Sequence, residues 1–347
     1  MVEKSTLNLQ LEPIRHFLDN PDITEVIINK PCVVITESKG TWQYYDIAAI
    51  DHEWCQAAAK LIANSANSEI HQENAILSST LPTGERVQVV VPPVSANISF
   101  TIRRPMSGIM ELSQIIATGS FNHTRLEQSL RLLEEERTKI DKRLPERDIE
   151  LLTLFQDRQW QDFITKAVLY RKNIIFSGET GSGKTTLGNA CAALIPENER
   201  IITVEDTREM RLDHKNQVNL LYTRDSKGSQ KVSAKQVLES TLRMRPDRVL
   251  LAELRGDEAF FFIQNVINSG HPGTIATVHA NSAKLAFRRL LAMIQASPEG
   301  SVMEPNVILE MLYSLIDIVI QTQRTADGRK IVTEIYFDPA FAHQQMG

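Results

Sequence analysis

The chain has 347 residues, 42% of them hydrophobic, and a net charge of −5. This length predicts two domains, and the negative charge argues against an extensive surface for nucleic acid. The three cysteines (Cys32, Cys55 and Cys191) show no CxxC spacing, which argues against a zinc site or a disulfide framework and is typical of a reducing compartment.

The sequence shows no segment for export or membrane insertion. Its first residues lack a continuous apolar stretch, so no signal peptide is predicted. No window approaches the ~18 uncharged apolar residues of a membrane span. We therefore expect a cytoplasmic protein without an integral membrane segment.

The first part of the chain predicts a small α+β domain, covering residues 1–110. Two segments have helical spacing and several short β-branched runs have the composition of strands. The Pro92-Pro93 pair separates the last two strands. The expected helices are 7–18 and 54–64, and the expected strands are 23–28, 33–35, 87–91 and 98–102.

A charged segment follows, and we expect residues 111–157 to form a helical linker. Glu127 and Arg131, like Glu135 and Lys139, are opposite charges four residues apart in the favourable helical orientation. Two interpretations stay open, a solvated linker helix and a partner-binding helix. Because the connection is long, we do not expect sequence proximity to fix the placement of the first domain relative to the domain that follows it.

From residue 158 to 347 the pattern alternates between strand and helix. Such alternation predicts a mainly parallel sheet with helices on both faces, hence an α/β domain. The expected strands are 173–177, 201–204, 217–221, 248–251 and 273–277, and the expected helices include 187–194, 237–245 and 260–268.

One segment has the spacing of a phosphate-binding loop between a strand and a helix. Its glycines allow the backbone N–H groups to point at phosphates, and the helix beginning near Lys184 adds its positive end. Lys184 should reach the β- and γ-phosphates of ATP, and the Thr185 hydroxyl should hold Mg²⁺. In an empty site we expect the Lys184 side chain to be partly exposed. The nucleotide-binding residues are Gly178, Glu179, Thr180, Gly181, Ser182, Gly183, Lys184, Thr185 and Thr186.

Acidic residues follow two apolar strands of this domain. Glu205 and Asp206 end one strand and Glu253 ends another, and ligands of open parallel sheets bind at the carboxyl ends of strands. The alternative for either acid is a helix cap. His279 and His271 flank a further apolar run, where each could sense the γ-phosphate or serve a structural role.

Four segments in this order resemble the secretion ATPases, the hexameric RecA-like motors of type IV secretion, type II secretion and type IV pili. They correspond to the Walker A, Asp, Walker B and His boxes, at residues 178–185, 202–207, 249–256 and 270–279. Within this superfamily the chain is most similar to the type IV secretion branch, the VirB-eleven-like ATPases. The segments that carry this closer similarity are 22–29, 81–88, 99–105, 242–247 and 269–273.

The resemblance implies a ring of six subunits, each with an N-terminal domain and a RecA-like ATPase domain, and ATP between the two domains. It implies that Glu205 positions or activates the attacking water, that Glu253 serves Mg²⁺ or the water, and that His279 reads the γ-phosphate. Ala252 stands where many NTPases have aspartate, which leaves the division between the two glutamates open. The implied partners are inner-membrane channel components and coupling ATPases, with peripheral association at the inner membrane.

Three arginines of the first domain are candidates for contact with the γ-phosphate. Arg86, Arg103 and Arg104 lie at the ends of expected strands, and guanidinium groups bind phosphate oxygens in pairs. The family resemblance favours this role over that of surface arginines. Loss of the γ-phosphate would then release the first domain and convert hydrolysis into motion.

Other functions fit the sequence less well. A type IV pilus or type II secretion motor is the nearest alternative, although three scattered cysteines cannot build the four-cysteine zinc insertion of many type II motors. A nucleic-acid translocase is a second alternative, and the net charge of −5 argues against direct nucleic-acid binding. A small-molecule kinase is the third alternative, and the two-domain layout and the lack of a signature for an acceptor pocket argue against it.

Overall fold

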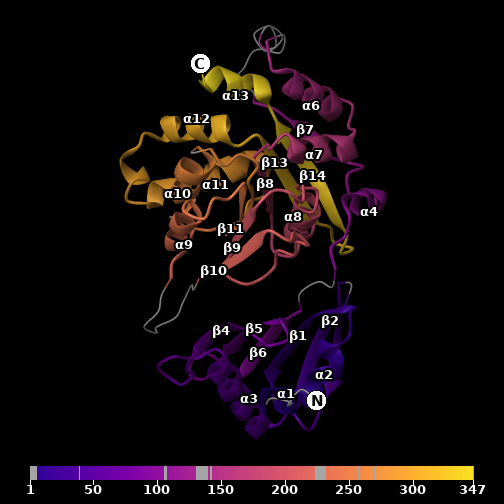
Figure 1. The fold of residues 1–347 in the computed structure, drawn as a ribbon. Coiled ribbons are helices and arrows are strands. Elements are labelled where there is room, and N and C mark those ends of the chain that lie inside the picture. Colours follow the sequence, from indigo (N-terminus) through magenta and orange to yellow (C-terminus); the bar gives the residue numbers. More distant parts are fainter. Residues whose placement is uncertain are drawn as a thin grey trace. The chain divides into compact units, whose positions relative to one another are not determined.

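The computed structural model describes residues 6–38, 40–104, 108–129, 140, 143–222, 232–256, 258–268 and 270–346. These residues form two compact units (Figure 1). The described residues up to Gly108 belong to the first unit, and those from Ile109 onward belong to the second.

The first unit is built on a six-stranded antiparallel sheet with the order β3-β2-β1-β6-β5-β4. Alternate residues such as Val87, Val89 and Phe100 point into one core, which the helices cover from a single face. The longest helix begins after Asp51, whose carboxylate accepts the Trp54 N–H at 2.7 Å. The elements are α1 (Thr6–Gln10), α2 (Glu12–Leu18), β1 (Ile23–Lys30), β2 (Val33–Ser38), β3 (Thr41–Asp46), α3 (His52–Ser65), β4 (Ile76–Thr80), β5 (Arg86–Val90) and β6 (Ser99–Arg103).

The second unit contains an eight-stranded sheet with the order β10-β9-β11-β12-β8-β13-β14-β7. The six strands from β10 to β13 are parallel to one another, β14 is antiparallel to β13, and β7 is parallel to β14. The strands are β7 (Arg125–Glu127), β8 (Ile174–Gly178), β9 (Ile201–Glu205), β10 (Gln217–Leu221), β11 (Arg248–Leu254), β12 (Ile275–Val278), β13 (Ile318–Arg324) and β14 (Lys330–Phe337).

Helices cover both faces of this sheet. The helical elements are α4 (Leu112–Ala117), α6 (Glu146–Gln156), α7 (Trp160–Leu169), α8 (Lys184–Ala192), α9 (Ala234–Thr241), α10 (Glu258–Phe261), the π-helix η1 (Phe262–Ile267), α11 (Ala283–Ala296), the 3₁₀-helix η2 (Gly300–Val302), α12 (Pro305–Leu315) and α13 (Pro339–Met346). Residues of α4, α6, α7 and α8 pack with one face, and residues of α9, η1, α11 and α12 pack with the other. The predicted α/β class, with a mainly parallel sheet in the second unit, is confirmed.

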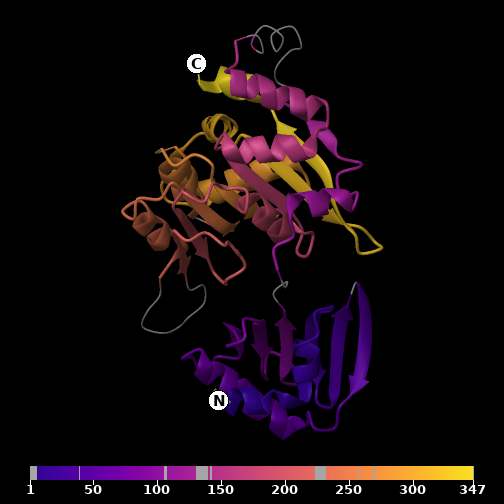
Figure 2. The same ribbon diagram turned by 45° about the vertical axis from the view of Figure 1, so that its right-hand side comes forward.

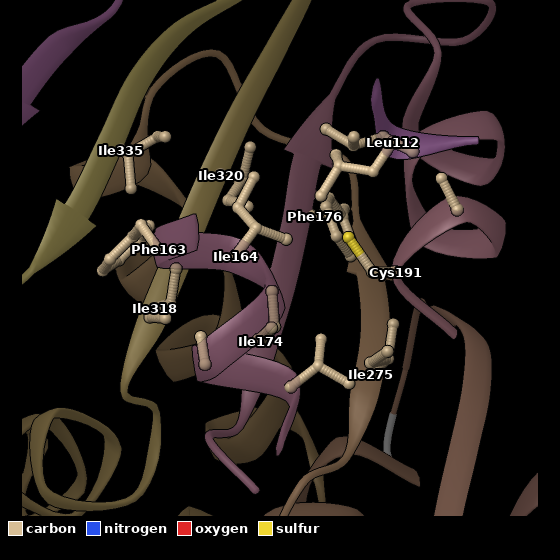
Figure 3. Packing of buried hydrophobic residues seen from close by; sticks show 14 of the residues in the cluster. Leu112, Phe163, Ile164, Ile174, Phe176, Cys191, Ile275, Ile318, Ile320 and Ile335 are labelled. Atoms are coloured by element: carbon tan, nitrogen blue, oxygen red, sulfur yellow. The ribbon is translucent and has the colours of Figure 1, made fainter. Parts of the chain in front are cut away.

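Burial on both faces explains the apolar runs in the central strands. On β8, Ile174 and Phe176 point toward α7 and α8 while Ile175 points to the opposite core. Figure 3 shows the first of these cores, where Phe163 and Ile164 of α7 lie against strand residues and Cys191 of α8 lies near Phe176. The Cys191 thiol is fully buried, and burial raises its pKa, so it behaves as a small apolar residue.

The interval 111–157 differs from the expected separate linker. Its described parts belong to the second unit: Leu126 of β7 pairs in register with Ile335 of β14, and Leu151 and Phe155 of α6 are buried in the core. The sequence did not indicate that α6 belongs to this core, because only one side of the helix is apolar and the other side is charged. Glu127, the first member of the first expected charge pair, lies in strand β7 and not in a helix. Residues 130–139, 141 and 142, which contain Arg131 and the Glu135–Lys139 pair, lie outside the described residues, and both interpretations of that helix stay predictions.

Candidate active site

The phosphate loop connects β8 to α8 and closes by means of its glycines. A Cβ atom on Gly178 would lie 2.4 Å from the carbonyl oxygen of Thr322 and 2.6 Å from Ser182 Oγ, so a side chain does not fit there. Gly181 and Gly183 have φ angles of +77° and +100°, which favour glycine. The loop therefore turns tightly into the first residue of α8, Lys184, and presents the amino end of that helix.

Lys184 is held against its own loop. Its ammonium donates to the carbonyl oxygens of Gly178 at 2.7 Å and Glu179 at 2.8 Å. The residue is 7% exposed, so the expectation of a partly exposed side chain is wrong. These two carbonyl oxygens hold the Lys184 ammonium beside the turn of the phosphate loop. When a nucleotide binds, its phosphate oxygens would replace the carbonyl oxygens as partners of the ammonium.

A carboxylate that the sequence reasoning missed contacts Thr185. The Thr185 hydroxyl donates to Glu209 Oε2 at 3.0 Å. Glu209 is held in turn by Glu205, because Glu205 Oε1 accepts the backbone N–H groups of Glu209 at 2.9 Å and Met210 at 2.7 Å. The sequence signal that could have identified Glu209 is its position, because it is a second acidic residue four positions after the strand-end acid Glu205.

Glu205 is fully buried at the end of β9. Burial raises the pKa of its carboxyl group, and the N–H groups of Met210 and Glu209 oppose that rise. Its second oxygen accepts the Thr203 hydroxyl at 3.3 Å. Both carboxylate oxygens therefore accept hydrogen bonds from protein groups.

Glu253, at the end of β11, lies in a network of charged side chains. Arg255 contacts both oxygens of the Glu253 carboxylate and also pairs with Asp206, with 3.0 Å between Nη1 and Oδ2. His279 Nε2 lies 3.0 Å from Glu253 Oε1. Arg255, in the Walker B segment at 249–256, joins the site in addition to the residues that the sequence singled out as catalytic.

His279 connects this network to the phosphate loop. Its Nδ1 lies 3.1 Å from the carbonyl oxygen of Gly178, and it donates to that oxygen in the tautomer with a proton on Nδ1. The same nitrogen is 3.4 Å from Lys184 Nζ. Burial lowers the pKa of His279, and the positive charge of Lys184 lowers it further.

The parallel strand order explains why these groups meet. β9, β11, β12 and β8 are neighbours in the sheet, and their carboxyl ends carry Glu205, Glu253, His279 and the phosphate loop. His271 precedes β12, whose first residue pairs with the first residue of β8. It therefore lies at the amino ends of these strands, away from the phosphate loop at their carboxyl ends. The structure thus places His279, the histidine to which the resemblance gives the γ-phosphate, beside the phosphate loop, and places His271 away from it.

The three candidate arginines belong to the first unit. Arg86 of β5 lies directly opposite Arg103 of β6, and Arg103 lies opposite Glu25 of β1. Arg103 Nε is 3.6 Å from Glu25 Oε1, and the Arg104 N–H donates to the carbonyl oxygen of Thr24. Like charges opposite each other on one face are unfavourable, and the Glu25 carboxylate beside Arg103 offsets part of this repulsion between Arg86 and Arg103.

The residues around Thr185 fit the Mg²⁺ that ATP brings. In the part of the chain that the structure describes, no group of three or more His, Cys, Asp or Glu residues forms a metal cage. Nucleotide-bound Mg²⁺ takes most of its ligands from phosphates and water, so the Thr185 hydroxyl with a carboxylate beside it is sufficient. Within the same described ranges, no helix is both long and apolar enough to cross a membrane.

A family model of type II/IV secretion system proteins matches residues 8–328. The chain belongs to this family. Among its relatives, type IV secretion system protein VirB11 of Bartonella quintana is 41% identical over 332 residues, covering 95% of this chain and 92% of the relative. Type IV secretion system protein PtlH of Bordetella pertussis is 36% identical over 340 residues, covering 96% of each.

Solved structures agree with this assignment. The crystal structure of the VirB11 ATPase from the Brucella suis type IV secretion system, in complex with sulphate, has a TM-score of 0.55 and 36% identity and covers 98% of this chain and 100% of that one. The pilus retraction motor PilT with bound ADP has a TM-score of 0.60 at 16% identity, covering 98% of this chain and 86% of that one, and shares the fold. This secretion ATPase therefore has the RecA-like fold that the sequence resemblance implied, and the prediction of an ATPase is confirmed.

Proposed function

We propose that this secretion ATPase is a hexameric, ATP-hydrolysing motor that powers pilus assembly or transfer of DNA or protein in a type IV secretion system. The observation that carries the proposal is the meeting of Lys184, Glu253 and His279 at one sheet edge beside the phosphate loop. The identity to VirB11 and PtlH supports type IV secretion over the pilus and type II alternatives. The proposed partners are inner-membrane channel components and coupling ATPases, at the cytoplasmic side of the inner membrane.

We further propose that the two units act as separate domains, the first ending near residue 108. The division of the chain into two compact units after Gly108 supports this proposal. The second domain then begins with α4 and includes the interval first expected as a linker.

The side chains of the second unit suggest distinct roles in hydrolysis. Lys184 would neutralise the β- and γ-phosphates, and Thr185, with the Glu209 carboxylate beside its hydroxyl, would hold Mg²⁺, which supplies further charge neutralisation when bound. Glu253 is the better candidate to orient the attacking water, because its side chain is 13% exposed whereas Glu205 is fully buried and bonded to its own turn. Glu205 would act by fixing Glu209 against Thr185.

Assembly is the first property to test. We expect specific ATPase activity to rise with protein concentration, because a RecA-like motor completes its sites in a ring, and light scattering should give the mass of a hexamer. Measurement of both quantities over the same dilution series would link activity to assembly. A monomer with full activity would contradict the motor proposal.

The arginines of the first unit give a second test. We propose that one or more of Arg86, Arg103 and Arg104 contributes to recognition of the γ-phosphate. Replacement of Arg86, or of Arg103 with Arg104, by alanine should weaken ATP binding or slow hydrolysis and leave ADP affinity unchanged.

A matched control is Arg15→Ala, because Arg15 of α2 donates to Asn8 in the same unit and is not a candidate. Titration of each variant with ADP and with a non-hydrolysable ATP analogue, together with turnover measurements, separates the two nucleotides. If the arginine variants treat both nucleotides as the wild type does, the arginines have no part in the mechanism.

A further inference from the structure

The hairpin of β13 and β14 lies along the outer flank of the phosphate loop. β13 pairs in parallel with β8, and the register continues to Thr322 opposite Gly178, the first residue of the loop. The next β13 residues therefore run beside the loop, up to the pair of Arg324 with Lys330 that closes the hairpin. The strands β8, β13 and β14 are consecutive in the sheet and are labelled in Figure 1, and the yellow hairpin of β13 and β14 can be followed in Figure 2.

Several contacts attach this hairpin to the loop. The Thr322 hydroxyl donates to the carbonyl oxygen of Ser177 at 3.1 Å and accepts from Ser182 Oγ at 2.8 Å. The Arg324 N–H points to Glu179 Oε1 at 3.4 Å. The hairpin and the phosphate loop are consequently held at a fixed spacing where the loop turns.

The two basic side chains at the end of the hairpin reach the glycines of the loop. A Cβ atom on Gly183 would lie 3.1 Å from Lys330 Cδ and 3.4 Å from Lys330 Cβ, so the aliphatic part of Lys330 passes directly over Gly183. A Cβ atom on Gly181 would lie 4.0 Å from Arg324 Nη1. The guanidinium group of Arg324 thus lies beside the middle of the loop.

This part of the loop is the one that surrounds the α- and β-phosphates in phosphate-binding loops. The groups placed at the γ-phosphate, Glu253 and His279, come from β11 and β12, on the other side of β8 from the hairpin. The hairpin cations therefore flank the part of the nucleotide that ATP and ADP share. No residue of the hairpin was a candidate in the sequence analysis.

We propose that Arg324 and Lys330 form a cationic flank of the nucleotide site, which binds the α- and β-phosphates and so contributes equally to the binding of ADP and of ATP. The inference rests on nucleotide binding at the phosphate loop. Guanidinium and ammonium groups that reach phosphate oxygens form charge-assisted hydrogen bonds. Loss of either should weaken ADP and ATP equally, speed ADP release and raise the KM for ATP more than it lowers kcat.

The test compares Arg324→Gln and Lys330→Gln with the wild type in the full chain. Titrations with MgADP and with a non-hydrolysable ATP analogue should show each variant binding both nucleotides about tenfold more weakly. Arg324→Lys and Lys330→Arg, which keep the charge, should recover part of the loss. Added salt should reduce the difference for the exposed Lys330.

Arg329→Gln is the matched control, because it removes the same charge from the same hairpin. Arg329 is exposed and pairs with Asp327 at 2.6 Å, at the tip of the hairpin, and its replacement should leave both affinities unchanged. Wild-type affinities in either glutamine variant, a loss confined to the ATP analogue, or an equal loss in Arg329→Gln would each overturn the proposal. Absence of ADP binding in the wild type would instead refute the nucleotide site itself.

Discussion

Replacement of Lys184 by alanine should abolish ATP hydrolysis and leave the fold intact. The ammonium is fixed by the carbonyl oxygens of Gly178 and Glu179, so it stands at the loop before the nucleotide arrives. Charge that develops on the γ-phosphate is then neutralised without rearrangement of solvent, and removal of one such donor costs at least about 10²-fold in rate. Steady-state phosphate release, with the circular dichroism spectrum as the check on folding, measures the effect.

Two further variants make this result specific. Lys184→Met retains the buried aliphatic chain, and it should be as inactive as alanine because the charge is what hydrolysis requires. Lys235→Ala removes a lysine that pairs with Glu299 on the surface at 2.6 Å, and it should hydrolyse ATP as the wild type does. Activity of Lys184→Ala within about tenfold of wild type would refute the assignment of the loop.

Local pattern was sufficient to predict the phosphate loop and the strands around it. Glycine spacing fixes the turn between β8 and α8, and β8 and β9 read as continuous apolar runs because both faces are buried. The acids at the ends of β9 and β11 could be found for the same reason, since a polar residue directly after a buried strand is conspicuous. These features depend on residues close together in the sequence.

The rest of the site depends on pairing between distant segments. Arg324 and Lys330 approach the loop only because β13 lies beside β8, more than a hundred residues earlier in the chain. The three-residue strand β7 exists because β14 offers it an edge. Arg255 acquires its partners when β9 and β11 become neighbours and bring Asp206 within reach. No periodicity in the sequence specifies which strands are adjacent, so these contacts could not be anticipated.

The distinction between the two strand-end glutamates is a result of the structure. Glu205→Gln keeps an oxygen that can accept the N–H groups of Glu209 and Met210, so the turn that carries Glu209 should persist. Its effect on hydrolysis should be smaller than the sequence alone suggested. The effect of Glu253→Gln should be large, since Glu253 lies between His279 and Arg255 at the sheet edge that holds the phosphate loop.

We expect Glu253→Gln to bind ATP with nearly unchanged affinity and to hydrolyse it at least about 10²-fold more slowly, because an amide cannot accept the proton of the attacking water. Arg255 still has Asp206 as a partner in this variant, so the surrounding side chains should remain in place. Single-turnover hydrolysis of bound ATP isolates this step from product release. Glu299→Gln makes the same chemical change on the surface and is the control, which should hydrolyse ATP at the wild-type rate. Slower hydrolysis in Glu205→Gln than in Glu253→Gln would reverse the assignment and place the water beside the buried carboxylate of β9.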